Sequence, residues 1–177
     1  MAESLQLVCF AWDPADAGAI RGGVAMGCQI VALNPADFGK CGNIWDMEKH
    51  AKLAGQFYQE LISGNRITYV YVRGNEYLGE ISLVFDKDDP DYTRAGRRIY
   101  VSRLLVKPEE RRRGIGTDLI RFSVCRAREM SYSEMSIGVD LDNYPALKLY
   151  TALGFNQVIC VDEDEQGKYI KLMKRIE

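Results

Sequence analysis

The stretch LLVKPEERRRGIGTDLI, Leu104 to Ile120, joins an apolar run, a proline, three arginines and two glycines to a segment with helical spacing. Gly114 and Gly116 have no Cβ, so a ligand can approach the backbone there closely. The first N–H groups of a helix have no acceptor within the helix, and they point out of its positive end. Three guanidiniums beside these donors predict a local binding site for phosphate.

The composition limits the kind of protein that this chain can be. Of its 177 residues, 47% are apolar, which is enough for the core of one domain. The formal net charge of −2 argues against general nucleic-acid binding, so the arginines are expected to serve a local anion. No apolar run approaches the roughly 20 residues of a membrane-spanning helix. We therefore expect neither a nucleic acid nor a membrane as a partner.

The cysteines and the single histidine disfavour disulfides, zinc and histidine chemistry. His50 lies in the polar stretch EKHAKLAGQ, which favours a solvated helix face over a catalytic role. The cysteines are odd in number and lack the CxxC spacing of metal sites: they are Cys9, Cys28, Cys41, Cys125 and Cys160. We expect reduced thiols in a cytoplasmic protein that holds no metal.

Apolar periodicity predicts alternating strands and helices. Helices are expected at residues 48–62, 114–130 and 143–153. The segment 86–96 is a polar loop with four aspartates, and DEDEQG is expected to be the turn of a final hairpin. Strands are expected at residues 29–33, 67–72, 77–85, 98–106, 134–140, 155–161 and 168–174. This order predicts an α+β fold in which helices pack on the faces of a mixed sheet.

The first 27 residues differ from the rest because they are rich in Ala and Gly and have no clear periodicity. We interpret residues 1–27 as an N-terminal extension of uncertain order and residues 28–177 as a single domain. One hypothesis is that the part before Met26 is a translational extension or a loosely attached arm.

A second motif, NYPALKLYTALGF, runs from Asn143 to Phe155. Asn143 is suited to cap a helix that has Pro145 in its first turn and ends at Gly154. Alone, this pattern is typical of any well-capped amphipathic helix. Together with the upstream spacing of Arg111, Gly114 and Gly116, it closely resembles the GNAT superfamily of N-acetyltransferases. The resemblance is strong over residues 98–174 and extends to residues 29–85 in strand order only.

The resemblance implies a central, mostly antiparallel twisted sheet with a splayed parallel pair, flanked by helices, and acetyl-CoA as co-substrate. In such proteins the pantetheine arm pairs like an added strand with the splayed strand, at the positions of Leu104, Leu105 and Val106. The pyrophosphate lies on the glycine-rich turn, at the positions of Arg111, Arg112, Arg113, Gly114, Ile115, Gly116 and Thr117.

Three residues receive catalytic or positioning roles from the resemblance. The N–H of Leu104 would stabilise the oxyanion of the transition state, and Asn143 would hydrogen-bond the pantetheine. Tyr150 would face the departing CoA sulfur. Full proton transfer from a tyrosine near pKa 10 to a thiolate near 8.5 costs about 2 kcal/mol, so we expect Tyr150 to act by hydrogen bonding. Alternatively, Tyr150 is a core residue of an amphipathic helix.

The general base is the point at which this sequence departs from a common pattern of the superfamily. The residues before Leu104, IYVSR, offer no carboxylate, and the strand SIGVD offers only Asp140 near its end. Glu80, in YLGEISL, is the remaining candidate if its strand lines the acceptor cleft. The alternative is a glutamate that faces outward.

A weak base bears on the acceptor amine. A lysine-like amine costs about 4 to 5 kcal/mol to deprotonate at pH 7, whereas an α-amine costs only about 1. The aspartate loop could attract a cationic acceptor if it overhangs the cleft.

We expect an acyltransferase that moves an acetyl group to a primary amine by direct attack. A small-molecule amine is the first choice of acceptor, and a protein or peptide amino group is the second. The alternative from another class is a non-catalytic acyl-CoA-binding module. A homodimer stays open, because exposed strand edges and final hairpins are common dimer surfaces in the superfamily.

Overall fold

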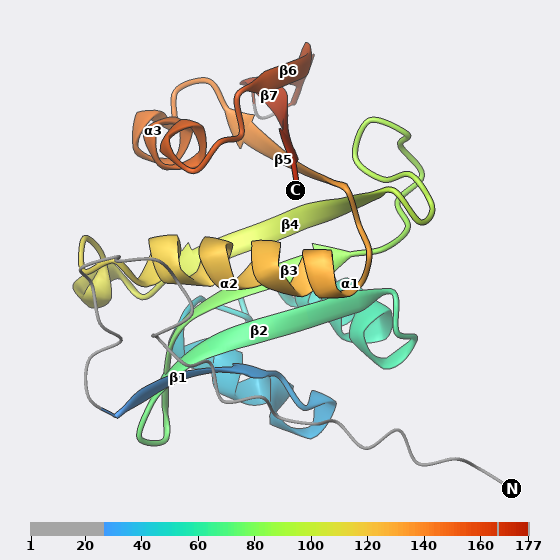
Figure 1. Cartoon of the computed structure of the whole chain (residues 1–177). Helices are drawn as coiled ribbons and strands as arrows, with labels where there is room; N and C mark the ends of the chain where they lie inside the picture. Colours follow the sequence, from blue (N-terminus) through green and yellow to red (C-terminus); the bar gives the residue numbers. More distant parts are fainter. Residues whose placement is uncertain (1–26, 166, 177) are drawn as a thin grey trace, which may run out of the picture.

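The computed structural model describes residues 27–165 and 167–176, so the prediction for residues 1–26 lies outside the described residues. The described chain forms a seven-stranded sheet in the order β1-β2-β3-β4-β5-β7-β6 (Figure 1). This confirms the predicted mixed α+β sheet. The strands are β1 (Cys28–Ala32), β2 (Arg66–Arg73), β3 (Glu76–Val84), β4 (Arg98–Val106), β5 (Glu134–Asp140), β6 (Gln157–Asp164) and β7 (Gly167–Arg175).

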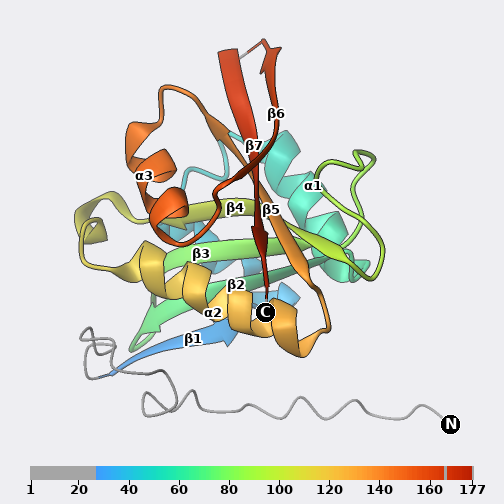
Figure 2. The same ribbon diagram turned by 45° about the horizontal axis from the view of Figure 1, so that its top comes forward.

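Helices cover both faces of the sheet (Figures 1 and 2). The α2 face carries α2 (Ile115–Glu129) and α3 (Tyr144–Ala152), whose buried residues share one core cluster with the middle strands. The α1 face carries the 3₁₀ helix η1 (Pro35–Asn43) and α1 (Ala51–Ile62), which pack on a second cluster. A short 3₁₀ turn, η2 (Pro108–Glu110), lies between β4 and α2.

The central strand β3 explains why the two clusters coexist. Eight of its nine residues are buried, as expected for a strand covered on both faces. Ile81 belongs to the cluster on the α2 face, whereas Tyr77 belongs to the cluster on the α1 face. The sheet is therefore the middle layer of three.

The parallel pair β4 and β5 separates halfway along its length. Its ladder joins Arg98–Val101 to Glu134–Ile137 and stops there. On the other side of β4, Leu83 pairs with Val101 and Ser82 with Arg103, which leaves Ser102 as one extra residue. Such a bulge bends the bulged strand and increases its twist. We call the resulting gap, between residues 102–106 of β4 and residues 138–140 of β5, the fork; it confirms the predicted splayed pair.

Two boundaries differ from the sequence prediction by three residues, and the others lie within two residues of it. Helix α1 begins at Ala51 rather than at residue 48, because residues 47–50 form turns. DEDEQG is not simply a turn, since β6 continues through Asp164, which pairs with Gly167. The opposite charges of Glu163 and Lys168 face each other in this ladder, and such cross-strand pairs favour strand over loop.

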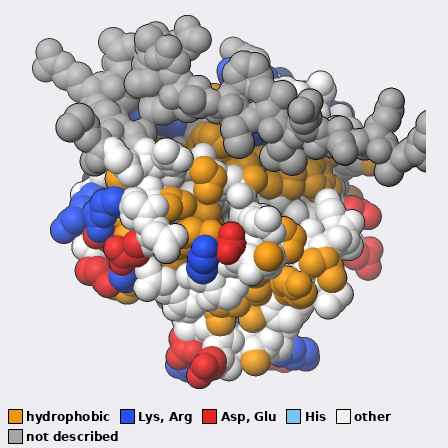
Figure 3. Space-filling model, turned by 90° about the horizontal axis from the view of Figure 1, so that it is seen from below, with side chains coloured by type: hydrophobic (Ala, Val, Ile, Leu, Met, Phe, Trp, Pro, Cys, Tyr) orange, Lys and Arg blue, Asp and Glu red, His pale blue; other side chains and the backbone are white. Residues whose placement is uncertain are grey.

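Three of the seven exposed large apolar side chains of the described residues lie on the two edge strands, and the other four lie on α1 and α3. Seen from the side on which β1 lies in Figure 1, hydrophobic side chains gather with few charged groups among them (Figure 3). Val31 of β1 is 37% exposed, and Val158 and Val161 of the opposite edge strand β6 are 59% and 56% exposed. A homodimer through either edge stays a prediction. The four cysteines within the described residues carry free thiols, and no helix there is long and apolar enough to cross a membrane.

Candidate active site

The arginine-glycine stretch forms an exposed turn that leads into α2. Arg112 and Gly114 have left-handed backbones, with φ of 63° and 89°. Alternation of this kind turns successive N–H groups toward one side. Among the described residues, the N–H groups from Arg112 to Thr117 have no hydrogen-bond acceptor, and no side chain caps the helix at Gly114. These six consecutive N–H groups, which we call the cradle, thus stay available at the positive end of a 15-residue helix.

The three arginines of this turn have different partners. Arg111 Nε donates to the carbonyl of Val106 at 3.1 Å. Arg113 donates to the carboxylate of Glu110 at 3.0 Å, and Arg73 binds the same carboxylate at 2.7 Å. The side chain of Arg112 has no hydrogen-bond or ion-pair partner in the described part of the chain. Arg112 is therefore the arginine whose charge is most available to a bound anion.

The two sequence motifs meet around Gly116. A Cβ on Gly116 would lie 3.5 Å from Leu149 of α3, 3.8 Å from Leu104 and 3.9 Å from Val106. The start of α2, the free part of β4 and helix α3 therefore converge at one point beside the fork. Leu104, Leu105 and Val106 pair with β3 on one side and lie beyond the ladder to β5 on the other. This is the geometry that an added strand requires.

Helix α3 places Asn143 and Tyr150 at its two ends. Asn143 Oδ1 accepts a hydrogen bond from the N–H of Ala146 at 3.3 Å, which confirms the predicted N-cap. Tyr150 is 7% exposed and packs beside Phe155. Its hydroxyl has no hydrogen-bond partner among the described residues. Because this hydroxyl is not fully buried, it retains contact with solvent.

Burial raises the pKa of Tyr150 to about 12, and the nearby Tyr100 adds to the effect. Transfer of its proton to a thiolate of pKa near 8.5 would then cost about 5 kcal/mol. A hydrogen bond from the intact hydroxyl carries no such cost. The role of Tyr150 at the sulfur stays a prediction, and Tyr150 also belongs to the core cluster on the α2 face, as the alternative expected.

Glu80 is buried beneath η1 on the α1 face, so the alternative of an outward-facing glutamate was wrong. Glu80 is 3% exposed, and Arg103 Nε donates a hydrogen bond to its carboxylate at 2.9 Å. Burial raises the pKa of Glu80, and the Arg103 charge and the Cys41 thiol oppose that shift. The Trp45 indole nitrogen lies near this carboxylate and makes no hydrogen bond of good geometry.

A cavity of about 490 Å³ opens on the α1 face beside the fork. Tyr100 and the bulged Ser102 of β4 line it, together with the side of α1 that carries Leu53, Gln56, Phe57 and Glu60. Glu80 is not among its lining residues. Sequence reasoning missed Tyr100 and Ser102, because it searched IYVSR for a carboxylate alone. The turn of β4 that brings these two side chains to a cavity leaves no local signal in the sequence.

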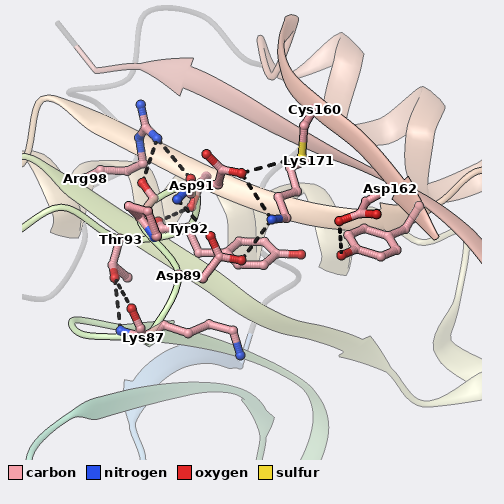
Figure 4. A network of polar contacts seen from close by, with 12 residues as sticks. Lys87, Asp89, Asp91, Tyr92, Thr93, Arg98, Cys160, Asp162 and Lys171 are labelled. Carbon is pink, nitrogen blue, oxygen red and sulfur yellow. Dashed lines mark hydrogen bonds and ion pairs between the residues drawn. The ribbon is translucent and has the colours of Figure 1, made fainter. Parts of the chain in front are cut away.

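The aspartate loop is only partly available to a cation. Asp89 and Asp91 bind the ammonium group of the buried Lys171 at 2.8 and 3.2 Å (Figure 4). They raise the pKa of Lys171 against the opposing effect of its burial. Asp86 and Asp88 line the cavity, and neither has an ion-pair partner within the described residues. The predicted attraction of a cation therefore rests on two aspartates rather than four, and Arg66 and Lys87 line the same cavity.

The model of the acetyltransferase (GNAT) family matches residues 29–155, which include the fork, the arginine-glycine turn and α3. The N-alpha-acetyltransferase 30 of Xenopus laevis is 31% identical over 90 residues, which cover 51% of this chain and 32% of that protein. The human protein of the same name matches equally, with 24% of its length covered. The matched region thus spans a third or less of these curated relatives.

Two solved structures show how widely the fold is shared. The aminoglycoside 6'-N-acetyltransferase from Enterococcus faecium has a TM-score of 0.64 at 16% identity, covering 84% of this chain and 97% of that one. A GNAT family acetyltransferase from Elizabethkingia anophelis with acetyl-CoA bound has a TM-score of 0.63 at 15% identity, covering 85% and 99%. Since the family model spans more than half of the chain, the chain belongs to the acetyltransferase (GNAT) family, whose members are acyltransferases that use acetyl-CoA.

Proposed function

We propose that this protein transfers the acetyl group of acetyl-CoA to the primary amine of a small molecule by direct attack. The observation that carries the proposal is the meeting of three features at the fork. These are six available N–H donors at the start of α2, an open edge of β4, and a tyrosine hydroxyl without a partner in the described chain. No covalent enzyme intermediate is needed.

The α2 face would hold the cofactor. The N–H groups of residues 112–117 would bind the pyrophosphate, with Arg112 adding charge. The backbone of Leu104 to Val106 would pair with the pantetheine arm, and the N–H of Leu104 would stabilise the oxyanion. Asn143 would contact the pantetheine, and the Tyr150 hydroxyl would donate to the sulfur as the thiolate leaves. Every group in this set is neutral or positive, which suits a cofactor that carries phosphates and a reaction that develops negative charge.

The α1 face would receive the acceptor, because the cofactor occupies the opposite side of the fork. The cavity of about 490 Å³ lies within the usual range of small-molecule sites. Asp86 and Asp88 at its edge would favour an acceptor with a second positive charge. An aminoglycoside 6'-N-acetyltransferase shares this fold, so the fold is compatible with a small amine as acceptor.

Glu80 is the candidate general base. Its raised pKa brings a carboxylate closer to the working pH, which makes it a better proton acceptor. Its ion pair with Arg103 and its place outside the cavity lining mean that a water molecule would have to link it to the amine. An acceptor amine of low pKa would reduce the demand on this base.

A second candidate acceptor is the α-amino group of a protein or peptide. The observation that favours it is the 31% identity to N-alpha-acetyltransferase 30 over 90 residues. An α-amine, with a pKa near 7.8, also suits the weak base apparatus. The remaining alternative, a non-catalytic acyl-CoA-binding module, predicts cofactor binding with no turnover of any amine.

Release of free CoA thiol from acetyl-CoA tests the proposal. The acceptors would be polyamines, aminoglycosides, amino acids, and short peptides with free N-termini or lysines. Tyr150→Phe should lower kcat about 50-fold, the value of a hydrogen bond to a developing charge, while the Kd of acetyl-CoA stays within twofold. Tyr58→Phe, which removes an exposed hydroxyl on α1, is the matched control and should keep full activity.

The outcomes separate the candidates. Turnover of one acceptor class, reduced in Tyr150→Phe, would support the transferase and name its substrate type. Thermal stabilisation by acetyl-CoA without turnover of any amine would instead favour the binding module.

A further inference from the structure

The connection between β3 and β4, residues 86–97, is a strap that packs on the α1 face of the sheet, where its Tyr92 contacts Tyr100. Polar contacts fix it there (Figure 4). Its Asp89 and Asp91 hold the ammonium group of Lys171 on β7, and Lys171 is only 5% exposed. Arg98 donates to the carbonyl of Asp91 at 2.9 Å and to the carboxylate of Glu134 at 2.8 Å. These contacts fix the position of the strap against β5 and β7.

The strap delivers Tyr92 to the base of the fork. The hydroxyl of Ser136 on β5 donates to the carbonyl of Tyr92. The ring then runs along β5, because a Cβ built on Gly138 would lie 2.4 Å from the Tyr92 hydroxyl oxygen. Gly138 is the first residue of β5 beyond the ladder to β4, which ends at Ile137. The Tyr92 hydroxyl thus occupies the space that a side chain at Gly138 would fill.

A second tyrosine completes this wall. The ring of Tyr100 on β4 packs against the ring of Tyr92 at a tilt of 43°, with 4.2 Å between the ring centroids. Tyr100 also lines the cavity beside α1. Neither tyrosine hydroxyl has a hydrogen-bond partner in the described part of the chain. Both hydroxyls keep some exposure to solvent, because neither is fully buried. Tyr100 thus connects the cavity, which it lines, to Tyr92, which lies against Gly138 at the base of the fork and does not itself line the cavity.

We propose that Tyr92 positions the acceptor amine at the fork and restricts it to amines carried on an unbranched CH₂ group. The inference rests on the proposed function, because the cofactor on the α2 face leaves only the α1 face for the entry of the amine. The Tyr92 hydroxyl accepts a hydrogen bond from the amine and so helps to aim its lone pair at the thioester. In this proposal the two packed rings of Tyr92 and Tyr100 would exclude a branch next to the nitrogen.

The protonation state of Tyr92 fits a positioning role. Burial raises the pKa of Tyr92, with a further contribution from Tyr100, so its hydroxyl is neutral at pH 7. Lys171, Lys87, Tyr169 and Asp89 are the other charged or titratable groups near this ring. A neutral hydroxyl accepts a hydrogen bond from an amine without removing its proton. Tyr92 thus orients the acceptor, and the removal of the proton is left to another group.

The experiment compares two acceptors in wild type, Tyr92→Phe and Tyr92→Ala. One acceptor is the best unbranched primary amine from the thiol-release panel, and the other is its analogue with one methyl group on the carbon that bears the nitrogen. Tyr92→Phe should raise the KM of the unbranched amine about fivefold, the value of one hydrogen bond, without changing the KM of acetyl-CoA. Tyr92→Ala should shift the ratio of kcat/KM toward the branched amine about tenfold.

Tyr58→Phe is the matched control and should change none of these values. Tyr92→Ala removes a buried ring and can fail to fold, in which case Tyr92→Phe, which keeps the ring, still tests the positioning role. Suppose that the wild type transfers acetyl groups and that the folded Tyr92 variants have the same acceptor KM and the same preference for unbranched amines. The inference then fails, while the proposed function stands. A wild type that acetylates no amine overturns the proposed function, and the inference falls with it.

Discussion

The two faces of the sheet differ at the fork in the kind of groups that they present. The α2 face offers backbone N–H groups, glycines and one open strand edge. The α1 face offers two tyrosine rings, a buried glutamate and two aspartates that have no ion-pair partner within the described chain. Backbone donors suit a cofactor whose shape never changes. Side chains suit an acceptor that differs from one enzyme of the family to the next. Changes on the α2 face should therefore alter cofactor binding, and changes on the α1 face should alter the acceptor and the rate.

Glu80→Gln tests the α1 face and has the largest expected effect. If Glu80 is the general base, its loss should lower kcat about 100-fold and leave the Kd of acetyl-CoA within twofold. Only the ionised carboxylate accepts a proton, so wild-type kcat should rise as the pH increases through the raised pKa of Glu80. That ascending limb should vanish in Glu80→Gln. A variant with an unchanged pH profile would show that the proton leaves by another route.

Gly114→Val tests the α2 face. The left-handed backbone at Gly114, φ 89°, is strained for a β-branched residue, so the N–H groups around it should lose their alignment. We expect the Kd of acetyl-CoA to rise about 30-fold, equivalent to the loss of about 2 kcal/mol of hydrogen bonding to phosphate.

Gly64→Val is the matched control for that change. Gly64 follows the end of α1, has a φ of 80°, and has open space where a Cβ would lie. Both variants should lose a similar amount of stability in urea unfolding, and only Gly114→Val should weaken binding by calorimetry. Equal Kd values of acetyl-CoA in the two variants would show that the aligned N–H groups of the cradle do not contribute to binding.

The difference between the faces also explains what could be predicted from sequence. The cradle and the cap at Asn143 follow from glycine, proline and asparagine at fixed local spacing, and the structure has both where they were expected. The α1 face depends on partners far apart in the chain. Tyr92 meets Gly138, and Lys171 meets Asp89 across 82 residues. Neither contact leaves a local pattern, because the first depends on residues 86–97 packing on β5 and the second on β7 lying beside β5 in the sheet.

Gly138→Ala tests the contact on which the wall of the fork depends. The added methyl would lie 2.4 Å from the Tyr92 hydroxyl, so the tyrosine must move, and we expect a loss of about 1.5 kcal/mol in the free energy of unfolding. In a Tyr92→Phe background the nearest ring carbons would be 3.2 and 3.3 Å away, and the loss should be smaller. Urea unfolding of the four proteins gives the coupling. Equal losses in both backgrounds would mean that the methyl is accommodated without displacing Tyr92.

The smallest expected effect distinguishes two neighbouring arginines within the cradle. Arg112 has no side-chain partner in the described part of the chain, whereas Arg113 is bound to Glu110 and is partly neutralised by it. Arg112→Ala should raise the Kd of acetyl-CoA about fivefold at low salt, and the effect should shrink at high ionic strength, where exposed charges are screened. Arg113→Ala should change the Kd by less than twofold, because Glu110 already offsets its charge.

Calorimetric titrations at two salt concentrations measure the Kd of acetyl-CoA for both variants. A larger effect for Arg113→Ala would mean that Arg113 leaves Glu110 and contacts the phosphates when the cofactor binds.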